Sequence, residues 1–146
     1  MALKLLKGIW FVSMVTALIA LLYVYAGLPQ EVIVQKQATS QTSISSELFF
    51  YIVMMFLAIS NVMVFIISKV FVEKEDFRAW FHGLIMTLNI FFIIALIFIF
   101  QYNSNEKFDY ERIAFIIYGS LGLMVLWASF WPVYLIFRAF SLKSLV

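Results

Sequence analysis

The residues best suited to chemistry gather in one short stretch, "VEKEDFRAWFHG", which runs from Val72 to Gly83. It holds His82, the only histidine of the chain, and acidic side chains at Glu73, Glu75 and Asp76. A histidine can act as an acid, a base or a metal ligand near neutral pH, and a carboxylate can be its partner. A metal site needs three or four converging ligands, and no recognised ligand spacing joins His82 to Glu73. We therefore expect no metal site, no cofactor and no catalytic residue here.

The same stretch has the features of a loop between two membrane spans. Lys74 and Arg78 can meet anionic lipid headgroups, and Trp80 has the amphipathic ring that favours the membrane surface. It is also the largest polar surface that we expect on the cytoplasmic side. If a cytoplasmic partner docks, we expect it to contact Glu73, Lys74, Glu75, Asp76, Arg78, Trp80 and His82.

The composition indicates a membrane protein. The 146 residues are 65% hydrophobic and 12% charged, and the mean hydropathy is +1.03. A soluble domain has about half apolar and about a quarter charged residues. The absence of Cys excludes disulfides and thiolate metal sites, and the net charge of +2 is too small to indicate a nucleic-acid partner.

Four apolar segments are long enough to cross a bilayer as helices. A span needs about 20 residues to cross a hydrocarbon core of about 30 Å, and an open strand would leave backbone groups unpaired in lipid. We therefore predict an all-α integral membrane protein, a single domain over residues 1–146, with four transmembrane helices in an antiparallel bundle. The expected spans are 8–28, 48–72, 83–102 and 113–137, with outer loops at 29–47 and 103–112 and a cytoplasmic loop at 73–82.

The positions of the basic residues predict the orientation of the chain. Seven of the 10 Lys and Arg residues fall on the side of the termini and the central loop, and three fall on the other side. Because cytoplasmic loops carry the excess of basic residues, we expect both termini in the cytoplasm. The compact loops, the lack of Cys and the Ile-, Phe-, Lys- and Asn-leaning composition favour the bacterial inner membrane.

The predicted spans contain polar but almost no ionisable side chains. No Asp, Glu, Lys, Arg or His lies near the middle of any span, which argues against a proton-coupled transporter. Several uncharged polar residues fall at a similar depth and predict a polar layer inside the bundle. Such a layer can join helices through hydrogen bonds, or it can bind a ligand such as a quinone headgroup. Its members are Thr16, Ser60, Asn61, Asn89 and Ser129.

Small residues form one face on the first and on the fourth span. Ser13, Thr16 and Ala17 share a face of the first helix, and Gly119 and Gly122 share a face of the fourth. Small faces let helices approach closely. They predict helix–helix packing, within the chain or with a partner.

Local signals predict how the spans bend, end and connect. Pro132 is expected to kink the fourth span, and Asp109 is expected to cap its start. Trp10 and Trp80 are expected in the aromatic belt of the inner membrane surface. The alternating run "EVIVQK" at 31–36 predicts a short edge strand in the first outer loop.

These features favour a non-catalytic small subunit or scaffold of a larger inner-membrane complex, with the lipid bilayer and other membrane-protein subunits as its partners. A second hypothesis is a lipid-, quinone- or small-solute-binding or transport protein that acts as a homo-oligomer, based on Asn61, Asn89 and the Pro132 kink. A weaker alternative is a membrane enzyme that uses His82 on a lipid headgroup.

Overall fold

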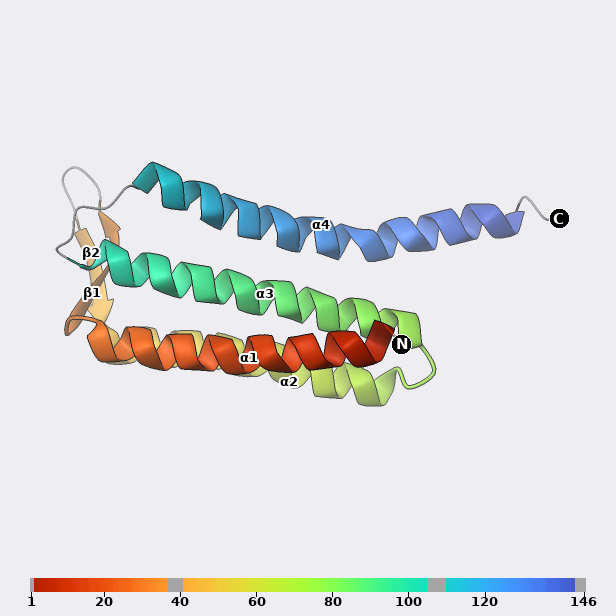
Figure 1. Cartoon of the computed structure of the whole chain (residues 1–146), viewed down its shortest axis with the longest axis horizontal. Coiled ribbons are helices and arrows are strands. Elements are labelled where there is room, and N and C mark those ends of the chain that lie inside the picture. The colour runs from red at the N-terminus through yellow and green to blue at the C-terminus, as the bar shows by residue number, and fades with distance from the viewer. Residues whose placement is uncertain (1, 37–40, 105–109, 144–146) are drawn as a thin grey trace.

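The computed structural model describes residues 2–36, 41–104 and 110–143, and it is dominated by four long helices (Figure 1). A small β-hairpin lies between the first and the second helix. The elements are α1 (Ala2–Gly27), β1 (Glu31–Lys36), β2 (Gln41–Ser45), α2 (Ser46–Val70), α3 (Glu75–Tyr102) and α4 (Tyr110–Lys143).

All four helices are long and apolar enough to cross a membrane. They contain 26, 25, 28 and 34 residues, and even the shortest is roughly 38 Å long at about 1.5 Å per residue. That exceeds a hydrocarbon core of about 30 Å. The prediction of a multi-pass helical membrane protein therefore agrees with the structure.

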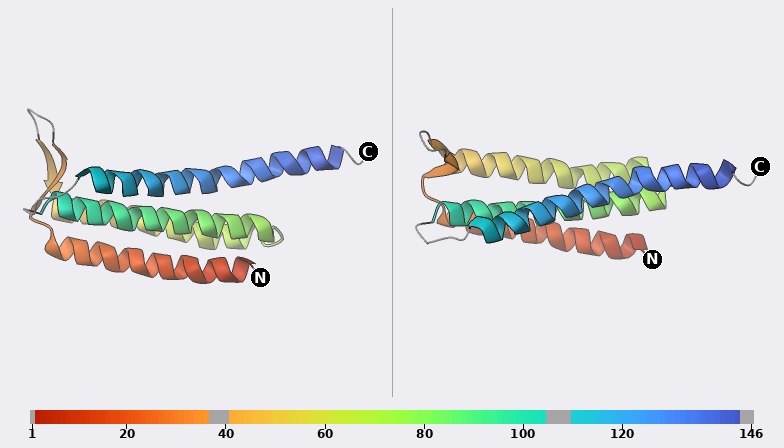
Figure 2. Two further views of the ribbon diagram at one scale, coloured as in Figure 1. Left: turned by 45° about the horizontal axis from the view of Figure 1, so that its top comes forward. Right: turned by 90° about the horizontal axis from the view of Figure 1, so that it is seen from above.

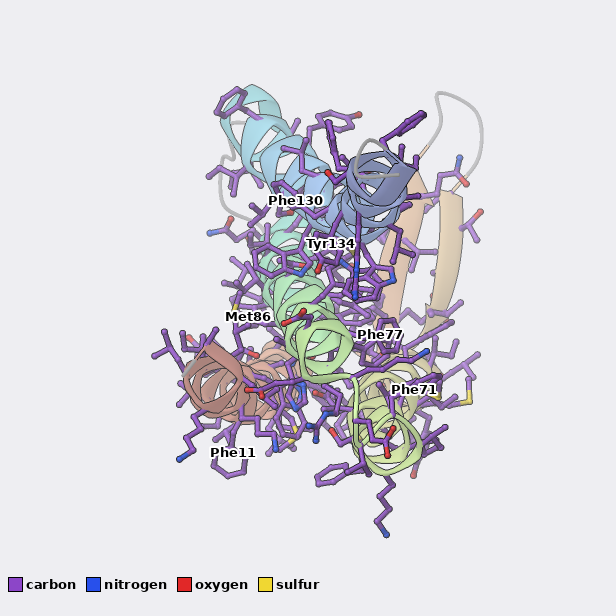
Figure 3. All side chains as sticks on the ribbon, turned by 90° about the vertical axis from the view of Figure 1, so that its right-hand side faces the viewer. Phe11, Phe71, Phe77, Met86, Phe130 and Tyr134 are labelled. Atoms are coloured by element: carbon purple, nitrogen blue, oxygen red, sulfur yellow. The ribbon has the colours of Figure 1, made fainter. Side chains whose placement is uncertain are left out.

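The helices α1, α2 and α3 pack against one another, whereas α4 contacts α3 alone among the described helices. Seen end-on, α1 and α2 lie on one side of α3 and α4 lies on the other (Figure 3). The N-terminus, the α2–α3 connection at residues 71–74 and the C-terminus lie toward one end, and the hairpin lies at the opposite end (Figures 1 and 2).

The buried residues of α1 follow the helical period. Trp10, Ser13, Ala17, Leu21 and Val24 are all buried, at steps of three and four residues. Such a stripe keeps one face of a helix against its neighbours over its whole length. The opposite face of α1 is apolar and uncovered, as expected where a helix meets acyl chains.

Two apolar clusters form the core. The first lies toward the hairpin and includes Leu21, Leu57 and Leu96, one residue from each of the three packed helices. The second lies toward the α2–α3 connection and consists of Trp10, Val64 and Ile85. A buried polar residue lies between the two clusters on each helix: Ser13 on α1, Asn61 on α2 and Asn89 on α3.

The hairpin confirms the strand expected at 31–36 and adds a second strand that the polar sequence of Gln41–Ser45 did not predict. The two strands pair antiparallel, with an irregularity between Ile33 and Gln35. Val32 is fully buried against the first apolar cluster and so ties the hairpin to the helices. Asn103, at the end of α3, accepts a hydrogen bond from the Ile33 N–H (2.7 Å) and donates one to the Ile33 carbonyl (3.1 Å).

Three boundaries lie well outside the expected spans, and the first is the start of α1, at Ala2 rather than at residue 8. The helix α3 begins at Glu75 rather than at Gly83, because Phe77 and Trp80 pack against Trp131 of α4 at centroid distances of 5.0 and 5.7 Å. The helix α4 continues past residue 137 to Lys143 and includes Pro132. The capping role expected for Asp109 lies outside the described residues.

Candidate functional site

Asn61 of α2 and Asn89 of α3 face each other inside the three-helix core. The Asn61 side chain donates from Nδ2 to Asn89 Oδ1 (3.0 Å), and Asn89 donates from Nδ2 to Asn61 Oδ1 (3.1 Å). Asn61 is 5% exposed and Asn89 is fully buried. The two amides therefore form a reciprocal pair that joins α2 to α3.

Two residues of α1 complete the network. The indole N–H of Trp10 donates to Asn61 Oδ1 (2.9 Å), and Asn89 Nδ2 also donates to the hydroxyl of Ser13 (3.1 Å). The Ser13 hydroxyl in turn donates to the Trp10 carbonyl (2.7 Å). All three packed helices thus meet at one set of hydrogen bonds, which we call the asparagine network: Trp10, Ser13, Asn61 and Asn89.

The asparagine network has no spare donor. Asn61 uses its remaining N–H on the Leu57 carbonyl (2.8 Å), and its oxygen accepts two hydrogen bonds. Both N–H groups of Asn89 are also used, so only one lone pair of its oxygen lacks a partner. A groove of about 280 Å³ passes Asn61 between α1 and α2. Since the amide is already satisfied, a ligand in that groove would meet mainly apolar side chains.

The other members of the expected polar layer do not join this network. Thr16, Ser60 and Ser129 each donate to the carbonyl four residues earlier in their own helix, at 2.9, 2.6 and 2.8 Å. The structure therefore brings together two of the five predicted residues. Such back-bonding satisfies a hydroxyl locally, and it is the usual state of Ser and Thr in a helix.

His82 is buried, whereas the acidic residues expected as its possible partners, Glu73, Glu75 and Asp76, are exposed. It is 2% exposed, its Nδ1 lies 2.6 Å from the Arg78 carbonyl oxygen, and its ring meets the Trp10 ring edge-on at 5.5 Å. Glu73, by contrast, is exposed. His82 therefore packs beside the asparagine network, against Trp10, and its Nδ1 contacts a backbone carbonyl.

The expected docking loop is divided by the early start of α3. Glu73, Lys74, Glu75 and Asp76 are exposed. The remaining members turn into the protein: His82 faces Trp10, Arg78 is half-buried with its Nε unpaired, and Trp80 faces α4. Of the seven residues, four are therefore exposed, Arg78 and Trp80 are half-buried, and His82 is buried.

A second interhelical contact joins α3 to α4. Trp80 donates its indole N–H to the Trp127 carbonyl (2.9 Å), and Trp127 donates to the Trp80 carbonyl (2.9 Å). The Trp127 ring covers Gly83 so closely that a Cβ at that position would lie 2.2 Å from its Cζ2. Sequence reasoning missed this pair, because Trp80 beside a span end is typical of the aromatic belt and Trp127, inside the fourth span, was not singled out.

Trp10 and Ser13 were also missed as members of the asparagine network. Their spacing with Asn61 and Asn89 carries no recognised motif. One signal was present: Ser13 and Ala17 share the small-residue face of the first span, and both are buried. Small residues mark the side of a helix on which a neighbouring helix packs closely. In α1, this side faces the Asn61–Asn89 pair.

The fold defines a helical multi-pass membrane protein in which the amides of Asn61 and Asn89 are hydrogen-bonded within the chain. The chain matches no protein-family model, and neither curated proteins nor solved structures show a significant match to it.

Proposed function

We propose that this protein is a non-catalytic subunit or scaffold of a larger membrane complex, and that α4 is the helix that binds its partner. The one-sided packing of α4 carries this proposal. In the most apolar window of each helix, 28% of the residues of α1, 17% of α2 and 28% of α3 are buried, against 6% in α4. A helix attached along a single seam leaves most of its surface free for another chain.

The surface of α4 is suited to a close helix contact. Gly119 and Gly122 have no atom within 4 Å of the position where a Cβ would stand. In membranes, where both lipid and side chains are apolar, helices associate through close packing at such small residues. The small face that the sequence predicts on α4 therefore remains open for a partner helix.

The satisfied asparagine network supports a structural role over ligand transport. A transport site keeps polar groups available for its cargo, whereas Asn61 has none to spare. We infer that Asn61 and Asn89 hold α2 and α3 together, and that the alternative of quinone or solute binding at these residues is the weaker one.

The orientation and the location belong to the same proposal. The end that holds the N-terminus and the α2–α3 connection carries Lys4, Lys7, Lys69 and Lys74, and this excess of basic residues favours the cytoplasmic side. The hairpin end is then on the outer side. The bacterial inner membrane is the location that best fits the composition.

The test is a pull-down of the tagged chain from its native membranes in a mild detergent. We expect a stoichiometric membrane-protein partner with the wild-type chain and its loss with Gly122→Leu, which fills the open face of α4. Gly8→Leu is the matched control, because Gly8 in α1 is equally uncovered. Recovery of the wild-type chain alone would contradict the proposal, and equal loss with both variants would remove α4 as the binding helix.

A further inference from the structure

A pocket lies where α4 runs beside the α2–α3 connection. Its volume is about 520 Å³, and it is lined by side chains of both signs. The carboxylates are those of Glu73, Glu75 and Asp76, at the α2–α3 connection and the start of α3. Of the two cations, Lys74 belongs to the same connection and Arg138 belongs to α4. No hydrogen bond or ion pair among the described residues joins Arg138 to these carboxylates.

The pocket continues into an apolar groove along α3 and α4. Asp76 and Trp131 line both, and the groove adds Trp80 and Tyr134, with a volume of about 350 Å³. Figure 3 looks onto this end and shows Phe77 and Tyr134 in the region between the two helices. The Phe77 and Trp131 rings lie 5.0 Å apart and line the pocket, and Trp131 also lines the groove.

The position of the pocket is that of a lipid headgroup. It lies at the end of α2, which stops at Val70, and at the start of α3, which begins at Glu75. Both apolar segments end there, so the pocket is at the level of the membrane surface. The groove leads from it toward the lipid-facing sides of α3 and α4. A phospholipid has the same order of parts: a charged head, a glycerol and acyl chains.

The charges select the class of headgroup. An anionic headgroup would meet three carboxylates, and a purely cationic ligand would leave Arg138 unused. A headgroup with both an ammonium and a phosphate satisfies both signs, because N–H donors pair with carboxylates and guanidinium pairs with phosphate. A primary ammonium can donate to Glu73, Glu75 or Asp76, which a trimethylammonium cannot.

We propose that this pocket binds the headgroup of phosphatidylethanolamine. The ammonium lies at the carboxylates of the α2–α3 connection, and the phosphate lies at Arg138. The glycerol and the first acyl carbons follow the groove past Trp131 and Tyr134.

The experiment measures lipid binding to the purified chain by native mass spectrometry. The probes are phosphatidylethanolamine, phosphatidylcholine and phosphatidylglycerol with identical acyl chains. We expect phosphatidylethanolamine to bind about tenfold more tightly than the other two, and Arg138→Gln or Asp76→Asn to abolish that preference. Lys69→Gln is the matched control: Lys69 is exposed near the same end but does not line the pocket.

The outcomes separate the explanations. Equal binding of the three lipids would overturn the proposal, as would a preference that survives in both variants. Equally tight binding of free glycerophosphoethanolamine would also overturn it, because the groove would then contribute nothing. Asp76 and Arg138 are exposed, so the variants should keep the wild-type helicity. Because the isolated chain is used, the result does not depend on the partner proposed for α4.

Discussion

Trp80 and Trp127 each donate an indole N–H to the backbone carbonyl of the other, at 2.9 Å in both directions. The reciprocal pair crosses from α3 to α4 beside Gly83, which provides the space for the Trp127 ring. In a low-dielectric region, an unpaired indole N–H is costly. The pair therefore fixes the distance between α3 and α4 and the rotation of α4 about its own axis. Among the described helices, α3 is the only one that α4 contacts.

Gly83→Ala is expected to loosen α4. The new methyl group would overlap the Trp127 ring, so the ring or the helix has to move, at a cost of about 1 to 3 kcal/mol in the free energy of unfolding. The measurement is unfolding of the purified protein in detergent and SDS, followed by helicity. Gly8→Ala is the control, because its Cβ would meet nothing within 4 Å. An unchanged unfolding midpoint in Gly83→Ala would show that Trp127 does not pack as described.

Asn61→Leu and Asn89→Leu are expected to be strongly non-additive. Each single change leaves the other buried amide with unpaired groups and costs about 1 to 2 kcal/mol of stability. The double change removes both amides and should cost clearly less than the sum, which a double-mutant cycle of unfolding free energies measures. Thr16→Val is the control, because Thr16 bonds only its own helix. Additive losses would argue against a direct Asn61–Asn89 contact.

Asn103→Leu is expected to release the hairpin from α3 and to leave the helices intact. It removes the two hydrogen bonds to the Ile33 backbone, so exchange of the Ile33 amide hydrogen should become at least about tenfold faster. Hydrogen exchange by mass spectrometry measures this. Ser104→Ala is the matched control, since the Ser104 hydroxyl bonds only the Gln101 carbonyl. Equal protection in Asn103→Leu would mean that strand pairing and Val32 hold the hairpin without Asn103.

The proposed orientation has a direct test, because the chain contains no Cys. Glu73→Cys and Ser43→Cys place single thiols at exposed positions on the two ends. With a membrane-impermeant maleimide, we expect labelling of Glu73→Cys only in inverted vesicles and of Ser43→Cys only in right-side-out vesicles. The opposite pattern would reverse the assignment made from the basic residues.

The helices could be predicted from the sequence because bilayer thickness sets a minimum length for an apolar run. The start of α3 could not be predicted this way. The charges at Glu75, Asp76 and Arg78 mark the membrane surface, but a helix does not have to end at that surface. Contacts of Phe77 and Trp80 with α4 stabilise two further turns, and such contacts depend on tertiary packing.

The asparagine network was predictable in part. Asn61 and Asn89 stand out because amides are rare in apolar spans, and their equal depth brings them together. Their partners Trp10 and Ser13 depend on the rotation of α1, which the sequence does not specify. Trp10 in particular has the position of an interfacial residue but is only 6% exposed, since its indole N–H reaches Asn61.

The one-sided attachment of α4 has a consequence for biosynthesis. A membrane protein leaves the ribosome from its N-terminus, and its N-terminal parts can fold during synthesis. All members of the asparagine network lie in α1, α2 and α3, so these three helices can complete their hydrogen bonds before α4 is translated. The helix α4 then joins a preformed unit through α3, and the partner proposed for α4 would meet it as it enters the membrane.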